Sequence, residues 1–460
     1  MENNLVYGIK DKPKFGAMLV FAIQQLLAIL AATIAVPAIV GNGMSASAAL
    51  FGAGVGTLVY QLFTKFRSPV FLGSSFAFIG SMSAAFAGAA SASLGYLGLL
   101  LGAAFAGLIY VIIALVVKFA GIKWINKIMP AAVIGPTVAL IGLSLSGAAI
   151  KDVFSYGETK PFGLSQYFVM NTTAWVSLAC ALVTLSVVIL CSTYGKKMIK
   201  LIPFILGILA GYIVGLVFTG IGYATENDAL KIIDFAPFIE LFKDGIDFRS
   251  FFQVPEFTFV SAIKGVKDFD ISYLATVAAA YIPVAFVVFA EHLADHKNLS
   301  SIIGKDLTED PGLHRTLLGD GIGSVAGAFF GGCPNTTYGE SVGCVAITRN
   351  ASVVTITTTA FMAILIAFVS PFVAFLDSIP GCVMGGVCIT LYGFIAVSGL
   401  KMIQKVDLED NANLFTVAAI LIPGVGGMAM AIGEVYITTI ACALILGIIV
   451  NAVLHLKKKD

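Results

Sequence analysis

The sequence predicts an all-α polytopic membrane protein. Its 460 residues are 58% hydrophobic and only 12% charged, whereas charged residues make up about a quarter of an ordinary soluble domain. Apolar runs long enough to cross a hydrocarbon core of about 30 Å recur along the whole chain. Between them we find no stretch that could hold a soluble domain of any size.

Charge and cysteine content exclude several other classes. Residues 1–16 carry charges of both signs and no short apolar core before a cleavage site, so they do not resemble a signal peptide. The net charge of +1 suggests neither nucleic acid nor an acidic surface as a partner. The seven cysteines lie in or beside apolar segments without a CxxC pair, which favours burial over disulfides or metal sites.

Fourteen membrane spans are expected from the apolar runs between charged breaks. Seven lie in a first repeat, residues 1–222, and seven in a second, residues 271–460, with an extracellular connecting segment at 223–270. The expected spans are 15–40, 46–64, 69–89, 93–118, 129–149, 171–193, 201–222, 271–298, 316–332, 333–348, 353–375, 379–400, 411–430 and 433–454.

The distribution of basic residues predicts the orientation. With a cytoplasmic amino terminus, the short loops rich in Lys and Arg fall on one side, as the positive-inside rule requires. These loops are residues 64–67, 121–127, 194–200, 296–315, 349–350, 401–405 and 456–460. We therefore expect a multi-pass protein of the cell membrane with both termini in the cytoplasm.

An odd number of spans in each half means that the two halves enter the membrane in opposite senses. Such inverted repeats are typical of secondary transporters, with the substrate site near mid-membrane. The third span begins SPVFLGSSFAFIGS and the tenth begins GGCPNTTYGES, and both are too rich in Gly, Ser, Thr and Pro for an unbroken helix facing lipid. Irregular backbone at that depth requires surrounding protein or a water-filled cavity, so we expect broken segments that line a cavity.

Two other glycine-rich stretches have a simpler interpretation. GAGVG at 52–56 and GDGIGSVAG at 319–327 lack the strand or the GK[ST] sequence that nucleotide loops need. Small residues let helices approach closely in a membrane. We expect both stretches to serve helix packing.

Ionisable side chains inside spans are functional candidates, since burying a charge there costs at least ~2.5 kcal/mol. Glu291 and Glu340 stand out, and Asp295 shares one helix face with Glu291 at a spacing of four. The alternatives are a buried acid held neutral by a hydrogen bond at Glu291 and a helix cap at Glu340. His292 is interpreted as a packed helix residue, and Asp320 as interfacial.

Two carboxylates beside free backbone amides can both accept and donate hydrogen bonds in one plane. That pattern suits a small neutral heterocycle or amide. A carboxylate in a weakly hydrated cavity can also take up a proton near neutral pH. Proton uptake linked to substrate binding is the physical basis of symport.

Five stretches of the chain carry a family resemblance: QQLLAILAATIAVP (24–37), PVFLGSSFAFI (69–79), FAEHLADHKN (289–298), GGCPNTTYGESVGCVAITR (331–349) and PGCVMGGVCITLYGFIAVSG (380–399). They closely resemble the bacterial uracil permease branch of the nucleobase/ascorbate transporter family, and the similarity runs from residue 15 to the end. Two positions depart from the family pattern: Ser341 replaces the usual Asn, and Asp295 stands where members often have His.

The resemblance implies a fold and a function. The fold has a core domain of spans 1–4 and 8–11 and a gate domain of spans 5–7 and 12–14, with spans 3 and 10 each a short strand followed by a helix. The implied function is import of uracil by proton symport with alternating access, without enzymatic activity, cofactor or metal.

The resemblance also implies residue roles. Glu291 and Glu340 would accept ring N–H groups, and the backbone N–H groups of Phe76 and Gly339 would donate to ring carbonyls. Ala32 and Tyr338 would line the ring faces, and Tyr392 would lie at the gate. The proton-coupling candidates are Glu291, Asp295 and His296, with either Asp295 or His296 taking the part of the family histidine.

Several alternatives stay open at this stage. A purine (xanthine or uric acid) permease of the same family is one, and a channel, which needs a continuous polar stripe, is another. An intramembrane enzyme lacks support from any HExxH or GxSxG motif. Proton against sodium coupling is undecided, and the expected partners are the nucleobase and the lipid bilayer, with a homodimer left open.

Overall fold

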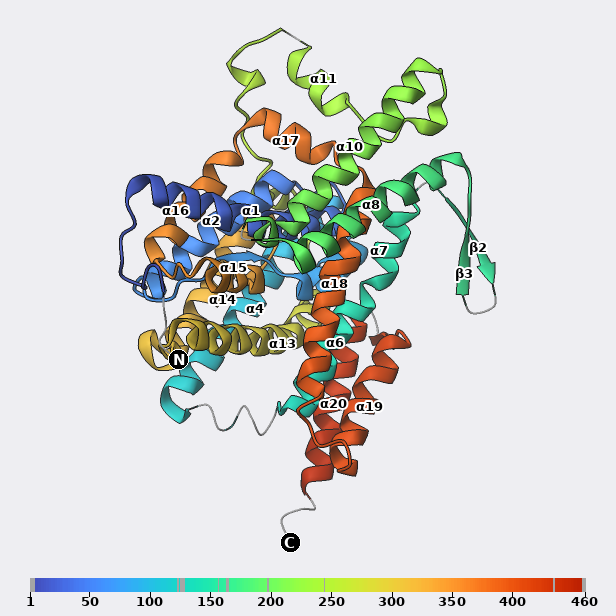
Figure 1. Cartoon of the computed structure of the whole chain (residues 1–460). Helices are drawn as coiled ribbons and strands as arrows, with labels where there is room; N and C mark the ends of the chain where they lie inside the picture. The colour runs from blue at the N-terminus through green and yellow to red at the C-terminus, as the bar shows by residue number, and fades with distance from the viewer. Residues whose placement is uncertain are drawn as a thin grey trace. The chain divides into compact units, whose positions relative to one another are not determined.

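The fold is mainly helical, with short strand pairs between helices (Figure 1). A computed structural model describes residues 5–121, 124, 129–155, 157–162, 165–196, 198–243, 245–432 and 435–456. The helices form two compact units, Met1–Ser144, Pro255–Leu365 and Phe394–Asp460 in the first and Leu145–Val254 and Ile366–Gly393 in the second. These boundaries differ from those of the expected core and gate domains, which stay a prediction.

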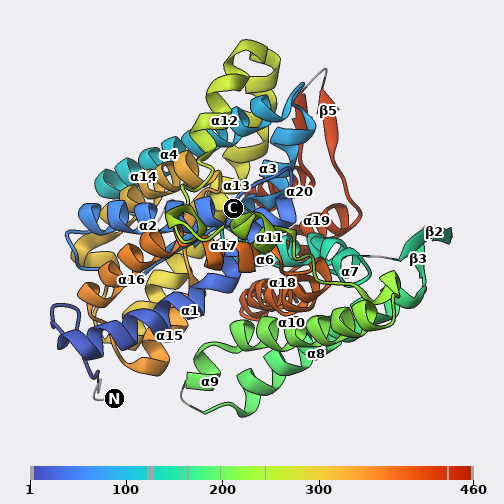
Figure 2. The same cartoon turned by 90° about the horizontal axis from the view of Figure 1, so that it is seen from above.

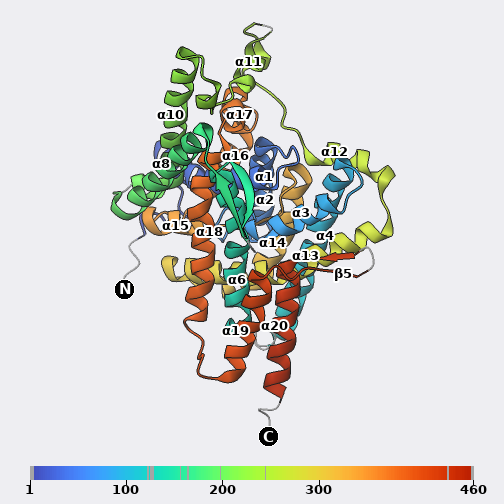
Figure 3. The same cartoon turned by 90° about the vertical axis from the view of Figure 1, so that its right-hand side faces the viewer.

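The first unit contains the broken segments and most of the candidate site. Its helices are α1 (Phe15–Val40), α2 (Ala46–Phe63), α3 (Ile79–Ala87), α4 (Ala92–Ala120), α6 (Ala131–Ser144), α12 (Thr258–Gly265), α13 (Ile271–Ile303), α14 (Leu313–Gly331), α15 (Gly339–Thr348), α16 (Val353–Ile366), α19 (Asn411–Val425) and α20 (Thr439–Leu456). Helices α19 and α20 lie side by side and pack against α6 (Figure 3).

The second unit is built around two long apolar helices. They are α8 (Thr172–Tyr194) and α10 (Pro203–Ala224), which pack along each other (Figure 2). Shorter helices complete the unit: α7 (Ser146–Val153), α9 (Met198–Leu201), α11 (Ala236–Phe242) and α17 (Ser370–Asp377). Helix α18 (Gly381–Ile403) begins in the second unit and ends in the first.

Glycines bring α2 and α14 together, as the sequence predicts. A Cβ atom on Gly52 would lie 2.4 Å from the carbonyl oxygen of Gly327, and one on Gly56 would lie 2.7 Å from that of Gly323. Figure 2 shows α14 lying between α2 and α4. The absence of side chains at these positions therefore sets the distance between the two helices.

Both predicted breaks are present, each as a short strand followed by a helix. Strand β1 (Leu72–Ser74) leads through the single turn η1 (Phe76–Phe78) into α3, and strand β4 (Asn335–Thr337) leads into α15. The two strands pair antiparallel, with Gly73 opposite Thr336. Backbone bonds from Tyr338 N to Phe71 O (3.2 Å) and from Ser75 N to Pro334 O (2.9 Å) extend the ladder.

Most of the expected spans correspond to a helix or to a strand–helix pair, but the span expected at 353–375 is divided between two helices, α16 and α17. Among the described residues, eight helices are long and apolar enough to cross a membrane. Apolar helices of 10–17 residues occupy four further positions: Phe76–Ala87, Val353–Ile366, Asn411–Val425 and Thr439–Leu454. A bilayer can tolerate shortened helices where neighbouring protein covers their ends.

Polar contacts place several of the predicted same-side loops together. The Arg67 guanidinium donates to Asp310 (2.8 Å), which joins the loop at 64–67 to the segment at 296–315. The pKa of the Asp310 carboxyl is lowered to about 2 by hydrogen bonds from Lys305 and Arg67. Near the amino terminus, Val6 N donates to Arg349 O (2.8 Å). These loops therefore share one side of the first unit.

Two hairpins were not predicted. Strands β2 (Glu158–Phe162) and β3 (Ser165–Val169) pair in the second unit, and β5 (Met430–Ile432) pairs with β6 (Val435–Ile437) in the first. The last expected span starts at 433, but the structure has β6 there and its helix α20 starts at Thr439. The predicted basic loops at 121–127 and 456–460 lie largely outside the described residues.

Replacing Gly52 by Ala should destabilise the protein, because the new methyl group would meet the backbone of Gly327. Overpacking of this kind costs about 1–3 kcal/mol, so the melting temperature of the purified protein should fall. Gly80→Ala on α3 is the control, since a Cβ there meets no atom within 4 Å. Equal melting temperatures for the two variants would contradict glycine packing of α2 on α14.

Candidate functional site

The start of α15 is open and not packed. Gly339 is its first residue and is exposed, and the nearest atom to a Cβ built there is Asp295 Oδ1 at 3.9 Å. The first N–H groups of a helix have no partner within the helix. Gly339 therefore presents backbone donors to open space, and helix packing does not explain the glycine.

Carboxylates surround this helix start. Glu291 and Asp295 lie one turn apart on α13, Glu340 is in the first turn of α15, and all three are partly exposed. Glu291 lies within electrostatic range of both Asp295 and Glu340. Thr337 Oγ1 of β4 donates to Asp295 Oδ2 (2.8 Å), which fixes one oxygen of that carboxylate. The predicted clustering of Glu291, Asp295, Gly339 and Glu340 is therefore present in the structure.

Tyr338 fastens the two strands together. Its hydroxyl donates to Ser74 O (2.7 Å), and its ring covers Gly73, where an added Cβ would lie 2.3 Å from the ring. Tyr338 and Ala32 are both buried, Ala32 with 0% exposure. Their expected position against a bound ring stays a prediction.

Ser341, which departs from the family pattern, is bonded to two elements. Its hydroxyl oxygen accepts from Gln25 Nε2 of α1 (2.5 Å) and from the backbone N–H of Phe71 (3.0 Å), just before β1. A serine hydroxyl can therefore meet the hydrogen-bonding needs of this position. It connects α15 to α1 and to the start of the strand pair.

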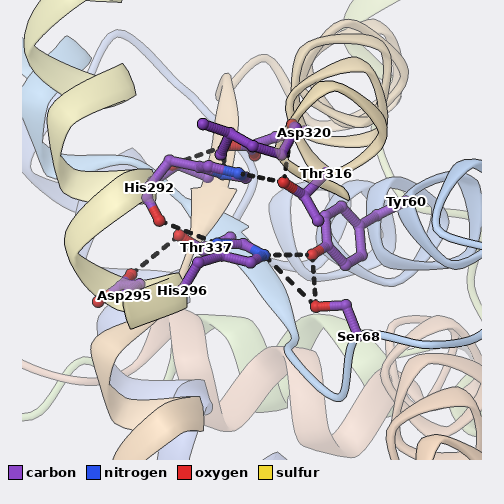
Figure 4. A network of polar contacts seen from close by, with 10 residues as sticks. Tyr60, Ser68, His292, Asp295, His296, Thr316, Asp320 and Thr337 are labelled. Atoms are coloured by element: carbon purple, nitrogen blue, oxygen red, sulfur yellow. Dashed lines mark hydrogen bonds and ion pairs between the residues drawn. The ribbon is translucent and has the colours of Figure 1, made fainter. Parts of the chain in front are cut away.

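A buried polar network joins α13 to α14 and α2 (Figure 4). His292 Nδ1 is 2.7 Å from Asp320 Oδ2, and both side chains have 0% exposure. His292 Nε2 lies 3.0 Å from Thr316 Oγ1, and Thr316 donates its hydrogen to Leu313 O (3.0 Å). Because Thr316 has one hydrogen, Nε2 must be the donor to Thr316. A proton then lies between His292 and Asp320, and the pair is neutral as a whole.

Asp320 is the principal site residue that the sequence interpretation missed. It was expected near a span end, whereas it is fully buried on α14 and also accepts from Thr336 of β4 (3.3 Å). A carboxylate between two glycines of a packed helix was the available signal. The expectation that His292 is a packed residue, by contrast, is confirmed by its burial.

His296 is held by protein groups on both ring nitrogens (Figure 4). A carbonyl oxygen only accepts, so Nδ1 donates to His292 O (2.9 Å). Nε2 lies 2.7 Å from the Tyr60 hydroxyl, which lies 2.7 Å from Ser68 Oγ. Both Tyr60 and His296 are buried. The ring therefore faces α2 rather than the open carboxylates.

The two remaining predicted residues are Phe76 and Tyr392. Phe76 is the first residue of η1, directly after the strand pair, and its side chain is buried. Tyr392 is a buried residue of α18 in the second unit, and its role at a gate stays a prediction. Within the described residues, no cluster of three His, Cys, Asp or Glu side chains suits a metal ion.

The apolar helices, the strand pair at their centre and the open carboxylates define a membrane transport protein. The sequence profile of a family described as "Permease family" matches residues 16–433. The chain belongs to this family, the nucleobase/ascorbate permeases. The expectation of a transporter rather than an enzyme is thereby confirmed.

Individual relatives agree with the family assignment. The chain is 36% identical to the uracil permease of Bacillus subtilis (strain 168), over 98% of this chain and 96% of that protein. It is also 36% identical to the uracil permease of Bacillus caldolyticus, over 98% and 95%. The transmembrane domain of a cyanobacterium bicarbonate transporter, BicA, has a similar fold, with a TM-score of 0.64, 16% identity and coverage of 96% of this chain and 100% of that one.

Ser341→Ala should destabilise the protein, because two buried donors, Gln25 Nε2 and Phe71 N, would lose their acceptor. A buried donor left unpaired costs about 1–3 kcal/mol, which a melting curve of the purified protein would detect. Ser301→Ala, at an exposed position on α13, is the control and should change little. A wild-type melting temperature for Ser341→Ala would refute a structural role of the hydroxyl.

Proposed function

We propose that the chain imports uracil into the cell by proton symport. The observation that carries the proposal is the exposed start of α15 at Gly339, beside the partly exposed carboxylates of Glu291, Asp295 and Glu340. Uracil has two ring N–H groups and two ring carbonyls, so it needs both acceptors and donors. The names of the relatives as uracil permeases support the same substrate.

The proposed binding mode uses the strand ends as well as the carboxylates. Glu291 and Glu340 accept the ring N–H groups, and the backbone N–H groups of Gly339 and Phe76 donate to the carbonyls. Strands β1 and β4 are antiparallel. The helix start at Phe76 therefore follows one end of the strand pair, and the helix start at Gly339 follows the other end. Ala32 and Tyr338 line the ring, and Tyr392 lies at the gate.

Asp295 is the better candidate for proton coupling than His296. Asp295 is partly exposed and has one oxygen bonded to Thr337, so its other oxygen can take a proton from the open face. His296 is buried and bonded at both nitrogens. Glu291, which is proposed to bind the ring, lies one helical turn from Asp295. A proton taken up by Asp295 would therefore lie next to the substrate.

The architecture proposed for transport follows from the paired breaks. Each break is the third segment of its half, so residues 1–222 and 271–460 are proposed as inverted seven-span repeats. Spans 1–4 and 8–11 form the core and spans 5–7 and 12–14 the gate, and alternating access follows from their relative movement. The site is in the cell membrane, with both termini cytoplasmic and a homodimer as the proposed assembly.

A purine permease is the second candidate, because uracil has one ring and a purine has two. The two ligands would differ mainly in the space that they need at the open face. Competition of unlabelled uracil, xanthine and uric acid against labelled uracil uptake would decide between them. A channel would show neither saturation nor accumulation against a gradient.

Uptake into membrane vesicles containing the protein tests the whole proposal. Labelled uracil should accumulate when the outside is acidic, and a protonophore should abolish the accumulation. A sodium gradient alone should have no effect. Accumulation that follows sodium and ignores pH would refute proton symport while leaving uracil as the substrate.

Gly339→Val should weaken uracil binding strongly and leave stability unchanged. The side chain would project into the open space beside Asp295, because no packed atom lies nearer than 3.9 Å. We expect affinity to fall by about tenfold or more, as for loss of a hydrogen bond to a buried ligand. Gly220→Val on α10, where a Cβ also meets no atom within 4 Å, is the matched control. Normal affinity of monodisperse Gly339→Val would exclude a backbone-lined site.

Glu291→Gln keeps the shape of the side chain but cannot take up a proton, and its amide donor would face a ring N–H. Concentrative uptake of uracil should be lost, and equilibrium binding should weaken by at least about tenfold. The control is Glu309→Gln, at an exposed position beyond the end of α13. Wild-type accumulation in Glu291→Gln would remove this residue from the mechanism.

A further inference from the structure

A small cavity lies within the first unit. It has a volume of about 10 Å³, and α4, α13, α14 and β4 contribute to its lining. Most of its wall is apolar, including Phe78 and Val288. Three polar side chains also line it: Tyr110 of α4, Ser324 of α14 and Asn335 of β4.

Each of these three side chains has a buried oxygen without a hydrogen-bond partner in the described part of the chain. The atoms are the Tyr110 hydroxyl, Ser324 Oγ and Asn335 Oδ1, and the residues are 3%, 5% and 2% exposed. The Thr336 hydroxyl lies close to Tyr110 without forming a regular hydrogen bond to it. An unpaired buried polar group costs about 1–3 kcal/mol, so three at one cavity require an explanation.

The orientation of Asn335 is determined by its neighbours. Its Nδ2 donates to Gly52 O (3.1 Å), and a carbonyl can only accept, so Oδ1 is the atom left for the cavity. The glycines of α2 and α14 leave room for this side chain, since a Cβ on Gly56 or Gly327 would lie within 2.4 Å of Asn335 Nδ2. The glycines thus make room for the Asn335 amide, whose oxygen has no partner among the described residues and which lines the same cavity as Tyr110 and Ser324.

We propose that this cavity is a binding site for one structural water molecule. A water needs roughly 10–15 Å³ of such space and two to four polar partners, and the cavity supplies about 10 Å³ and three partners. The hydrogen bonds also balance. The water donates to Asn335 Oδ1, accepts from the Tyr110 hydroxyl, and either donates to or accepts from Ser324 Oγ.

A monovalent cation of similar size fits this site less well. The three lining oxygens are neutral, and a buried cation needs compensating charge or many oxygen ligands. The nearby Asp320 has one unpartnered oxygen, but Asp320 and His292 share a proton and are neutral together. Water requires no such compensation.

The water has a structural task that follows from its partners. Asn335 pairs with Ser74 at the end of the strand pair, while Tyr110 and Ser324 belong to two long helices. One water thus adds a link from the broken span to α4 and α14, beside the bond from Thr336 to Asp320. The hydrogen bond between this water and Asn335 would help to fix β4, the strand that leads to Gly339.

Two tyrosine variants test the proposal through stability, independently of transport. Tyr110 and Tyr281 are both buried, and neither hydroxyl has a regular hydrogen-bond partner among the described residues, but Tyr281 does not line the cavity. Tyr110→Phe removes a bond to the water and should lower the melting temperature of the purified protein by about 2 °C or more. Tyr281→Phe removes only an unpaired hydroxyl and should leave the melting temperature unchanged or raise it.

Three results would overturn the proposal. If Tyr110→Phe is as stable as Tyr281→Phe, the cavity is dry. If sodium chloride, but not choline chloride, stabilises the wild type and loses this effect in Tyr110→Phe, the site binds a cation.

A wild-type density map at about 2 Å resolution is the second measurement. It should show one spherical peak at hydrogen-bonding distance from all three oxygens, and a map without that peak would refute the water even if Tyr110→Phe fails to fold.

Discussion

The structure depends on one constraint, which is that every backbone N–H and C=O group inside a membrane needs a partner. The chain breaks two helices at membrane depth and then satisfies the freed groups by pairing β1 with β4. The bonds from Tyr338 N and Ser75 N extend the pairing by one residue at each end. The start of α15 at Gly339 is exposed, and the first N–H groups of a helix have no partner within the helix, so a polar ligand can be held there.

The surrounding residues make this short pairing rigid. Tyr338 closes over Gly73, Ser341 ties the start of α15 to α1, and Thr336 and Thr337 donate to carboxylates on two different helices. The pair of carboxylates that receive these bonds differ in their setting. Asp320 is sealed with His292, whereas Asp295 keeps contact with the open face. The threonines thus anchor β4 between a buried carboxyl group, Asp320, and a partly exposed one, Asp295.

Sequence patterns predicted the helices, the two breaks and the glycine contact because each follows from local composition. The spacing of Glu291 and Asp295 on one helix, and the position of Glu340 after a break, also followed from the chain itself. The partners of Asp320 and His296 could not be predicted, because they lie on other elements: His292 of α13 and Thr336 of β4 bond to Asp320, and Tyr60 of α2 bonds to His296. The β2–β3 and β5–β6 hairpins were missed because their strands are short and adjoin apolar runs that read as helix.

The pairing of β1 with β4 also has a consequence for biosynthesis. The residues that complete the hydrogen bonds of Leu72–Ser74 lie more than 250 positions later, at Asn335–Thr337. The ribosome therefore makes the first broken segment long before its partner exists. Until residue 337 has entered the membrane, those backbone groups must be shielded by water, by the insertion machinery or by transient neighbours. The first half of the chain therefore cannot complete its hydrogen bonds alone. Strand β1 gains its partners only after β4, in the second half, has been synthesised.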